Sequence, residues 1–309
     1  MGQLVNGVWQ RGWYDPDSQG AFQRPAARFR DWVSADGSTA FPAESGRYHL
    51  YVSHACPWAH RTVLLRAIRG LEGAIGLTAV DPRMGDDGWS FGEEPDPLFG
   101  AKGLPELYLR ADPSCTSRVT VPVLWDKQTN TLVSNESREI MRMLDTAFDA
   151  FAGNPVSLAP ASLVPLIDET ITANYDSINN GVYKAGFATE QAAYEEACHA
   201  LFAALDRNEE TLGRTRFLCG DALTEADIAL FTTLLRFDVV YYSHFKCNLK
   251  RIADYTNISR FLREIYALPS VRPTCRLDHI KTHYYWSQTT VNPTRIVPLG
   301  PDLSALDGR

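Results

Sequence analysis

The sequence predicts an α/β domain in the first half of the chain and an all-α domain in the second half. Between His49 and Ser134, short β-rich stretches flank one strongly helical stretch. From about Pro160 the β-rich stretches disappear, and apolar residues recur at helical spacing. We expect four segments: an irregular, aromatic-rich extension over 1–45, an α/β domain over 46–150, an all-helical domain over 160–285 and an extended tail over 286–309.

The composition excludes several classes of protein. The chain has 309 residues, of which 45% are hydrophobic and 22% charged, values typical of a soluble globular protein. A net charge of −7 with no basic cluster argues against nucleic-acid binding. The six cysteines lack the spacings of a disulfide framework or a metal site, so we expect a cytoplasmic protein without a metal. No transmembrane run or secretory signal is recognised, and we expect no membrane partner.

The extension over 1–45 combines several glycines and prolines with Trp9, Trp13 and Trp32. Disordered segments are poor in aromatic residues. We therefore expect the extension to pack on the body of the protein.

The stretch from His49 to Gly70 predicts a strand that leads directly into a helix. Cys56 stands at the junction, and Pro57 suits the first helical position because its missing N–H costs nothing there. The free N–H groups and the dipole of a helix start favour a thiolate over a thiol, so the pKa of Cys56 should fall. Arg61 adds a positive charge about one turn later. Most cysteines are inert and buried, but this position favours a reactive sulfur.

The position that would hold a second cysteine in a dithiol motif is occupied by Ala59. A protein with only one such thiol must borrow another from solution to resolve a mixed disulfide. Glutathione is the obvious donor.

The following segments complete the first domain. Ile75 to Val80 predicts a strand parallel to the first, and the segment from Arg83 to Ser117, which contains Trp89, is expected to be a long functional loop. Val119 to Trp125 and Leu132 to Ser134 predict a hairpin. A hairpin and a helix after a βαβ unit form the thioredoxin arrangement. In that arrangement Pro122 would be cis and would present the Val121 backbone to a peptide-like ligand.

Residues 134–137 (SNES) open a helix that carries Ile140 and Leu144. The simplest interpretation is a helix cap. The same free N–H groups would also bind a carboxylate. In the second domain we expect helices over 163–178, 189–212, 226–241 and 258–267, with a capping box formed by Thr224 and Asp227.

Taken together, these motifs resemble the glutathione transferase fold, with a thioredoxin-like N-terminal domain and an all-α C-terminal domain. The resemblance is narrower to the Xi class, the glutathionyl-hydroquinone reductases, and it covers nearly the whole chain. It rests on CPWAHR at 56–61, RVTVPVLWD at 118–126, SNES at 134–137, NNGVYKAGFA at 179–188 and HYY at 283–285.

The resemblance implies a role for each matched residue. Cys56 would be the nucleophile, Tyr183 a proton donor or acceptor, and Tyr241 and Tyr284 would keep the thiolate charged. Because adjacent helical residues point about 100° apart, only one of Tyr241 and Tyr242 can do so. Glutathione would be bound by Trp89, Arg118, Val119, Thr120, Val121, Glu136 and Ser137. The further aromatic residues Tyr285 and Trp286 suit either a flat-ring pocket or core packing.

The implied activity is the reduction of glutathionyl-hydroquinones through a mixed disulfide between Cys56 and glutathione. Glutathione would be a co-substrate, with no tightly bound cofactor, and the enzyme would be a homodimer. An omega-like transferase that reduces dehydroascorbate or small disulfides would use the same cysteine. A non-catalytic binding module on this fold is the other alternative.

Overall fold

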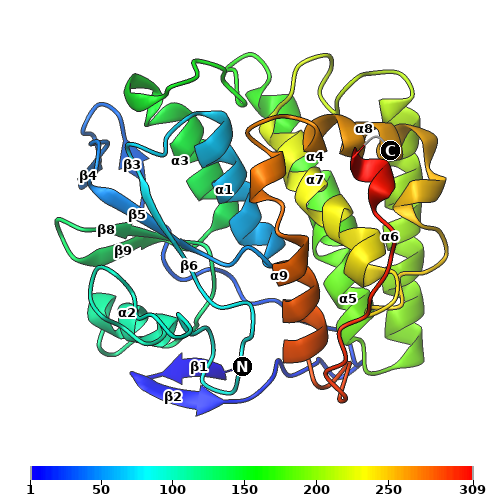
Figure 1. Cartoon of the computed structure of the whole chain (residues 1–309), viewed down its shortest axis with the longest axis horizontal. Coiled ribbons are helices and arrows are strands. Elements are labelled where there is room, and N and C mark those ends of the chain that lie inside the picture. The colour runs from blue at the N-terminus through cyan, green and yellow to red at the C-terminus, as the bar shows by residue number, and fades with distance from the viewer. Residues whose placement is uncertain (1, 308–309) are drawn as a thin grey trace. The chain divides into compact units, whose positions relative to one another are not determined.

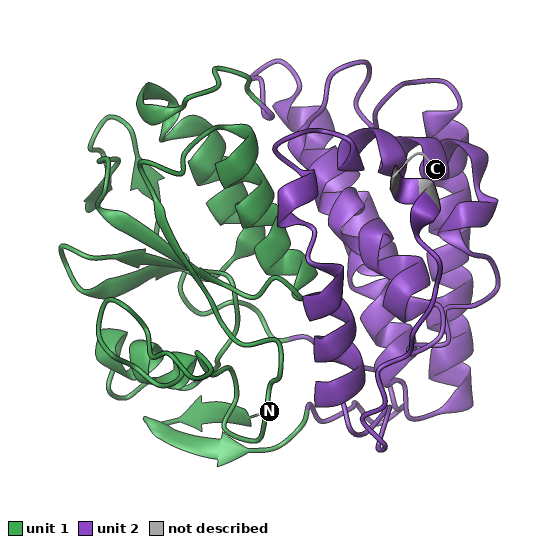
Figure 2. Ribbon diagram, in the orientation of Figure 1, with its two compact units in different colours: residues 1–13, 25–157 green, residues 14–24, 158–309 purple. Residues whose placement is uncertain are grey.

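The computed structural model describes residues 2–307 and divides into two compact units. Unit 1 comprises residues 1–13 and 25–157, and unit 2 comprises residues 14–24 and 158–309 (Figure 2). The N-terminal 45 residues are thus shared between the units. Within the described residues, no helix is both long enough and apolar enough to span a bilayer.

Unit 1 is built on a mixed four-stranded sheet of order β6-β5-β8-β9. The central strand β5 (Tyr48–Val52) is buried along its whole length and pairs in parallel with β6 (Gly76–Ala79). On its other side it pairs antiparallel with β8 (Val123–Asp126), which forms a hairpin with β9 (Thr131–Ser134). The predicted βαβ unit and hairpin are confirmed.

The helices of unit 1 cover both faces of this sheet. Figure 1 shows α1 (Pro57–Ile68) and α3 (Ser137–Thr146) together on one face and α2 (Leu104–Ala111) on the other. A short 3₁₀ turn, η1 (Asp149–Phe151), follows α3. Helix α2 lies inside the segment that we expected to be irregular. Its start is fixed by the Glu106 carboxylate, which accepts from the backbone N–H of Gly103 at 3.1 Å, and by Pro105 in its first turn.

The extension also contains regular structure that the sequence analysis did not predict. Strands β1 (Gly2–Val5) and β2 (Val8–Arg11) form a hairpin, and β1 pairs further with β7 (Ser117–Arg118). Asn6 and Gly7 both have positive φ, 49° and 79°, which is the geometry of a two-residue hairpin turn that favours Asn-Gly. A short parallel pair, β3 (Val33–Ser34) with β4 (Phe41–Pro42), completes the strands.

Unit 2 is helical. Its α-helices are α4 (Val164–Asn174), α5 (Gly181–Phe187), α6 (Gln191–Leu212), α7 (Glu225–Arg236), α8 (Thr256–Tyr266) and α9 (Leu277–Thr282). Helix α7 is buried throughout, and its predicted capping box is confirmed, with the Asp227 carboxylate accepting from Thr224 N at 2.8 Å. Short 3₁₀ turns are η4 (Ile252–Asp254), η5 (Arg272–Thr274) and η7 (Ser304–Asp307).

In the described part of unit 2, three helices continue into π-helical turns: η2 (Tyr175–Asn179), η3 (Phe237–Tyr241) and η6 (His283–Ser287). Each extends the α-helix before it, and η2 leads directly into α5. Such turns insert an extra residue and re-aim the side chains around them, and they are frequent at functional sites. Two of the predicted tyrosines lie on these turns, and the third lies on α5.

Candidate active site

Cys56 is the N-cap residue of α1, directly before Pro57. Its backbone is extended, with φ −77° and ψ 124°, and its side chain is half-buried. The Sγ atom lies 3.7 Å from the carbonyl oxygen of Val121. The first turn of α1 carries no acidic residue, so none of its own side chains opposes a thiolate at the positive end of the helix dipole.

The segment beside Cys56 is held by a buried tyrosine. The Val121–Pro122 peptide bond is cis, as expected. The Tyr108 hydroxyl donates to the Thr120 carbonyl at 2.8 Å and accepts from the Thr120 N–H at 3.2 Å. Asn135 Nδ2 donates to the Tyr108 hydroxyl at 3.1 Å and to Thr120 Oγ1 at 3.2 Å. Burial raises the pKa of Tyr108, which therefore stays a neutral donor.

The start of α3 carries Glu136 as its N-cap and Ser137 as its first residue. The Glu136 carboxylate accepts from the backbone N–H of Arg138 at 3.1 Å, so the capping role that we considered is present. Ser137 is buried, with 3% of its surface exposed. A helix start of this kind can also bind an external carboxylate through its remaining N–H groups.

Trp89 and Arg118, the other predicted glutathione ligands, both have structural contacts. Trp89 is buried, and its carbonyl accepts the backbone N–H of Leu104 at the start of α2 at 2.9 Å. The Arg118 guanidinium donates to the carbonyl oxygens of Gly12 at 3.2 Å and Trp13 at 2.9 Å. Arg118 thus anchors the end of the β1–β2 hairpin, a role that the sequence analysis did not predict.

In unit 2, Tyr183, Tyr241 and Tyr284 form a chain of hydroxyl groups that we call the tyrosine cluster. The Tyr284 hydroxyl lies 2.5 Å from that of Tyr183 and 2.9 Å from that of Tyr241. All three side chains are buried. Residues that are 43 and 101 positions apart in the sequence therefore meet at one point. Tyr285 is not part of this chain, because its hydroxyl bonds to Ser243.

The structure distinguishes Tyr241 from its neighbour Tyr242. Tyr241 is fully buried, stacks on Phe245 with centroids 5.4 Å apart and bonds to Tyr284, whereas Tyr242 is only partly buried. Burial raises the pKa of Tyr241 and of Tyr284 well above the usual range, and the nearby Tyr183 adds to this effect. Both phenols are neutral at physiological pH and can act as hydrogen-bond donors.

Arg24 contacts the tyrosine cluster through the ring of Tyr183. It belongs to the segment 14–24, which is part of unit 2. Its guanidinium lies over the Tyr183 ring, 4.8 Å from the centroid, and its Nε donates to Asn180 Oδ1 at 2.8 Å. Phe22 in the same segment packs edge-on against Phe187, at 5.3 Å. The segment thus fixes the ring of Tyr183 from one side.

Sequence reasoning missed three residues that position the candidate site: Tyr108, Asn135 and Arg24. Asn135 lies in the SNES motif, but its amide contacts cannot be read from that motif. Tyr108 and Arg24 lie in segments that we expected to be irregular, and nothing local in the sequence signals their partners.

Comparison with known proteins identifies the family. The family models described as "Glutathione S-transferase, N-terminal domain" and "Glutathione S-transferase, C-terminal domain" match residues 55–147 and 191–264. The glutathionyl-hydroquinone reductase YqjG of Escherichia coli is 51% identical over 100% of this chain and 98% of its own. Its glutathione-bound structure has a TM-score of 0.90, covering 97% of this chain and 96% of that chain at 48% identity.

Two further relatives agree. The glutathionyl-hydroquinone reductase PcpF of Sphingobium chlorophenolicum is 49% identical over 97% of this chain and 96% of its own. A Xi-class glutathione transferase structure from Natrialba magadii has a TM-score of 0.92 and 50% identity, covering 98% of this chain and 94% of that chain. The chain therefore belongs to the glutathionyl-hydroquinone reductases, the Xi class of the glutathione transferase family.

Proposed function

We propose that this protein reduces glutathionyl-hydroquinones to hydroquinones, with Cys56 as the nucleophile and glutathione as the second substrate. The observation that carries the proposal is the position of Cys56, at the start of α1 and 3.7 Å from the carbonyl oxygen of Val121. Two full-length relatives with the same named activity support it.

Glutathione would bind along the cis-proline segment and the start of α3. The backbone N–H and C=O of Val121 suit the tripeptide backbone, which would pair with them as an added strand. Glu136 suits the γ-glutamyl ammonium group, and Ser137 with the helix start suits its carboxylate. Val119 and Thr120 would form the wall of this groove, with Trp89 and Arg118 as its outer contacts. The Tyr108 and Asn135 hydrogen bonds hold Thr120 in place before glutathione arrives.

The first step breaks the bond between the ring and sulfur. Tyr183 helps a proton move to the ring carbon that carries sulfur, which gives a keto tautomer. The Cys56 thiolate then attacks the glutathione sulfur, and the electrons of the carbon–sulfur bond return to the ring. The hydroquinone leaves with a new C–H bond after taking up one proton, and Cys56 is joined to glutathione by a disulfide.

The second step restores the thiolate. The thiolate of a second glutathione attacks the glutathione sulfur of the mixed disulfide, so that oxidised glutathione leaves and Cys56 is again ionised. The two electrons gained by the aryl substrate are thus supplied by two sulfur atoms, and the chemistry needs no tightly bound cofactor. Neutral Tyr241 and Tyr284 would support the reacting groups as hydrogen-bond donors.

The cellular setting follows from the same chemistry. A mixed disulfide that must be resolved by glutathione requires a reducing compartment, so we place the enzyme in the cytoplasm. We further propose a homodimer, as expected from the family resemblance.

The test is an assay with glutathionyl-hydroquinone and glutathione, monitored for free hydroquinone and oxidised glutathione in equal amounts. Dehydroascorbate with glutathione serves as the competing substrate. Faster turnover of the aryl conjugate supports the proposal. Turnover of dehydroascorbate alone would favour the omega-like activity, and no turnover of either would favour a binding module.

A further inference from the structure

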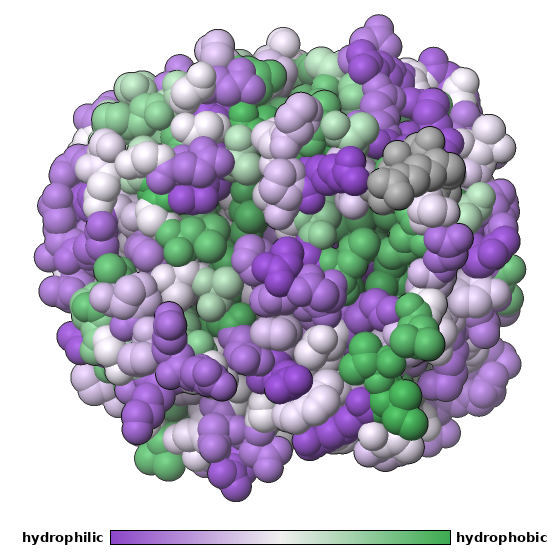
Figure 3. All heavy atoms as spheres, viewed as in Figure 1, coloured by the Kyte–Doolittle hydropathy of each residue, from purple (hydrophilic) through white to green (hydrophobic). Residues whose placement is uncertain are grey.

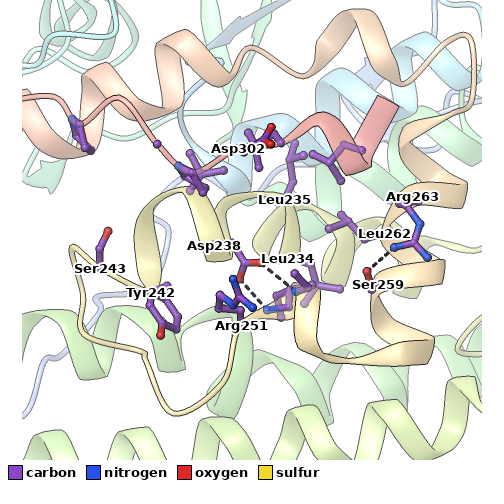
Figure 4. A pocket seen from close by; sticks show the side chains of 18 of the residues that line it. Leu234, Leu235, Asp238, Tyr242, Ser243, Arg251, Ser259, Leu262, Arg263 and Asp302 are labelled. Atoms are coloured by element: carbon purple, nitrogen blue, oxygen red, sulfur yellow. Dashed lines mark hydrogen bonds between the residues drawn. The ribbon is translucent and has the colours of Figure 1, made fainter. Parts of the chain in front are cut away.

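Unit 2 contains a cavity of about 330 Å³ that the proposed reaction does not use. It lies between α7, η3, η4 and α8 on one side and the C-terminal segment 298–306 on the other (Figure 4). Figure 4 shows Leu235 reaching up from α7 toward the C-terminal segment, where Asp302 lies. The walls are mostly apolar and include Leu234, Leu235, Val239, Leu262, Pro301 and Leu303.

Two of the charged residues that line the cavity, Asp238 and Arg251, have strong partners within the protein. The Asp238 carboxylate accepts from the backbone N–H groups of Ile252 and Ala253, at 2.7 and 3.0 Å. Arg251 pairs with Asp254 at 2.6 Å.

At the α8 end, Arg263 donates to Ser259 Oγ at 2.6 Å. The remaining acid, Asp302, is exposed to solvent. Arg263 is exposed to solvent as well, so water solvates both of these charges. A ligand inside the cavity would therefore meet mainly apolar side chains, with the nearby charges either paired or solvated, which favours an uncharged molecule.

The cavity is separate from the tyrosine cluster, although both are formed by residues of η3 and η6. Tyr241 and Tyr284 point their hydroxyls into the cluster, whereas their sequence neighbours Tyr242 and Tyr285 line the cavity. The Tyr285 hydroxyl is itself bound to Ser243. The cavity thus has two aromatic rings in its wall, a surface suited to flat aromatic molecules.

The C-terminal segment forms one wall of the cavity, which is partly open to solvent, and leaves apolar side chains exposed. Figure 3 shows apolar surface gathered along the path of this segment over unit 2. Ile296 is 68% exposed and Leu299 is fully exposed. Lys281 Nζ donates to the Leu299 carbonyl at 2.7 Å and ties the segment down. Displacement of the segment would widen the opening of the cavity.

From these observations we propose that the cavity binds a small uncharged aromatic molecule of about two fused rings. An apolar cavity of about 150 Å³ can hold one benzene ring, and ligand sites begin at about 300 Å³. A volume of about 330 Å³ therefore has room for a naphthalene-sized molecule. The paired or solvated charges favour neither an anion nor a cation inside the cavity, and the apolar walls offer mainly shape and ring contacts.

The test uses 2-naphthol, titrated calorimetrically into the full-length protein. We expect one equivalent to bind to the wild type. Leu235→Trp fills the cavity from α7, and Leu303→Trp fills it from the C-terminal segment, so each should weaken binding at least tenfold. Leu166→Trp, at a site on α4 that is 44% exposed, is the matched control and should bind as the wild type does.

Two further measurements keep the result interpretable. Retained turnover of glutathionyl-hydroquinone shows that a variant is folded, and if Leu235→Trp does not fold, Leu303→Trp carries the test. Binding to Cys56→Ser saturated with glutathionyl-hydroquinone should be unchanged, because the cavity is not the catalytic site. No binding to the wild type, binding by both filled variants as tight as by the wild type, or displacement by the conjugate would each overturn the proposal.

Discussion

The proposed glutathione-binding face of unit 1 and the tyrosine cluster of unit 2 are built in different ways. The first consists mainly of backbone groups at the ends of elements: the start of α1, the cis-proline segment and the start of α3. The second consists of three buried side chains on α5 and two π-turns, joined through hydroxyl hydrogen bonds and ring contacts. In the proposed reaction, the sulfur chemistry would thus depend on local backbone geometry, whereas the aryl chemistry would depend on side chains that are distant in the sequence.

The largest loss of activity should come from a substitution in the proposed glutathione-binding face of unit 1. Cys56→Ser removes the nucleophile, so turnover of glutathionyl-hydroquinone should fall by about 10⁴-fold or more. The matched control is Cys275→Ser, since Cys275 is also half-buried, and burial raises its pKa to about 11. Full activity of Cys56→Ser, or a comparable loss in the control, would contradict the assignment of Cys56 as the nucleophile.

The second prediction separates the two regions by substrate. Tyr183→Phe should lower turnover of the aryl conjugate by about 10²–10⁴-fold, because the ring carbon needs a proton. Reduction of a small glutathione mixed disulfide should fall far less, since its leaving thiolate is already stable. Tyr242→Phe is the control, because that residue lies outside the cluster. Equal losses on both substrates would make Tyr183 a positioning residue.

The third prediction compares the acid sensitivity of the two units through one buried histidine in each. Burial lowers the pKa of both His49 and His244 to about 4. Each stays neutral in the folded protein while its unfolded form takes up a proton below about pH 6.5. The free energy of unfolding should therefore fall as the pH drops from 6.5 toward 4, by about 2 kcal/mol per histidine at pH 5.

Urea unfolding of His49→Gln and His244→Gln at pH 7 and pH 5 measures how much each histidine contributes to the pH dependence of the free energy of unfolding. Each replacement should flatten the pH dependence, whereas His199→Gln, at an exposed position on α6, should leave it unchanged. If neither His49→Gln nor His244→Gln alters the pH dependence, these two histidines are not the cause of the acid sensitivity.

The smallest predicted effect concerns the support of the tyrosine cluster. Arg24→Ala removes a cation–π contact and a hydrogen bond to Asn180, so turnover of the aryl conjugate should fall about fivefold, or about 1 kcal/mol. Arg24→Lys should recover part of the loss. Arg214→Ala is the control, because its ion pair with Glu210 is exposed. Unchanged turnover in Arg24→Ala would show that Tyr183 holds its position without this support.

The same difference explains what the sequence could predict. The strand, Cys56, Pro57 and the helix are neighbours in the chain, so local rules predict their arrangement, and the parallel pairing of β5 with β6 confirms the βαβ unit. The Asn6-Gly7 hairpin was equally local and was overlooked within a segment that we judged irregular.

The tyrosine cluster could not be derived from local patterns. Tyr183 and Tyr284 are 101 residues apart, and only packing of the helices brings their hydroxyls to 2.5 Å. The π-turns that re-aim Tyr241 and Tyr284 leave no periodic signal in the sequence. The roles expected for them therefore came only from the family resemblance, and the structure was needed to show that Tyr241 rather than Tyr242 bonds to Tyr284.

The most direct test of the proposed reaction is a single turnover without free glutathione. Wild-type protein mixed with one equivalent of glutathionyl-hydroquinone should release one equivalent of hydroquinone and gain one glutathione, mapped to Cys56 by mass spectrometry. Added glutathione should then remove the adduct as oxidised glutathione. Hydroquinone release without an adduct on Cys56, or an adduct on another cysteine, would contradict the account.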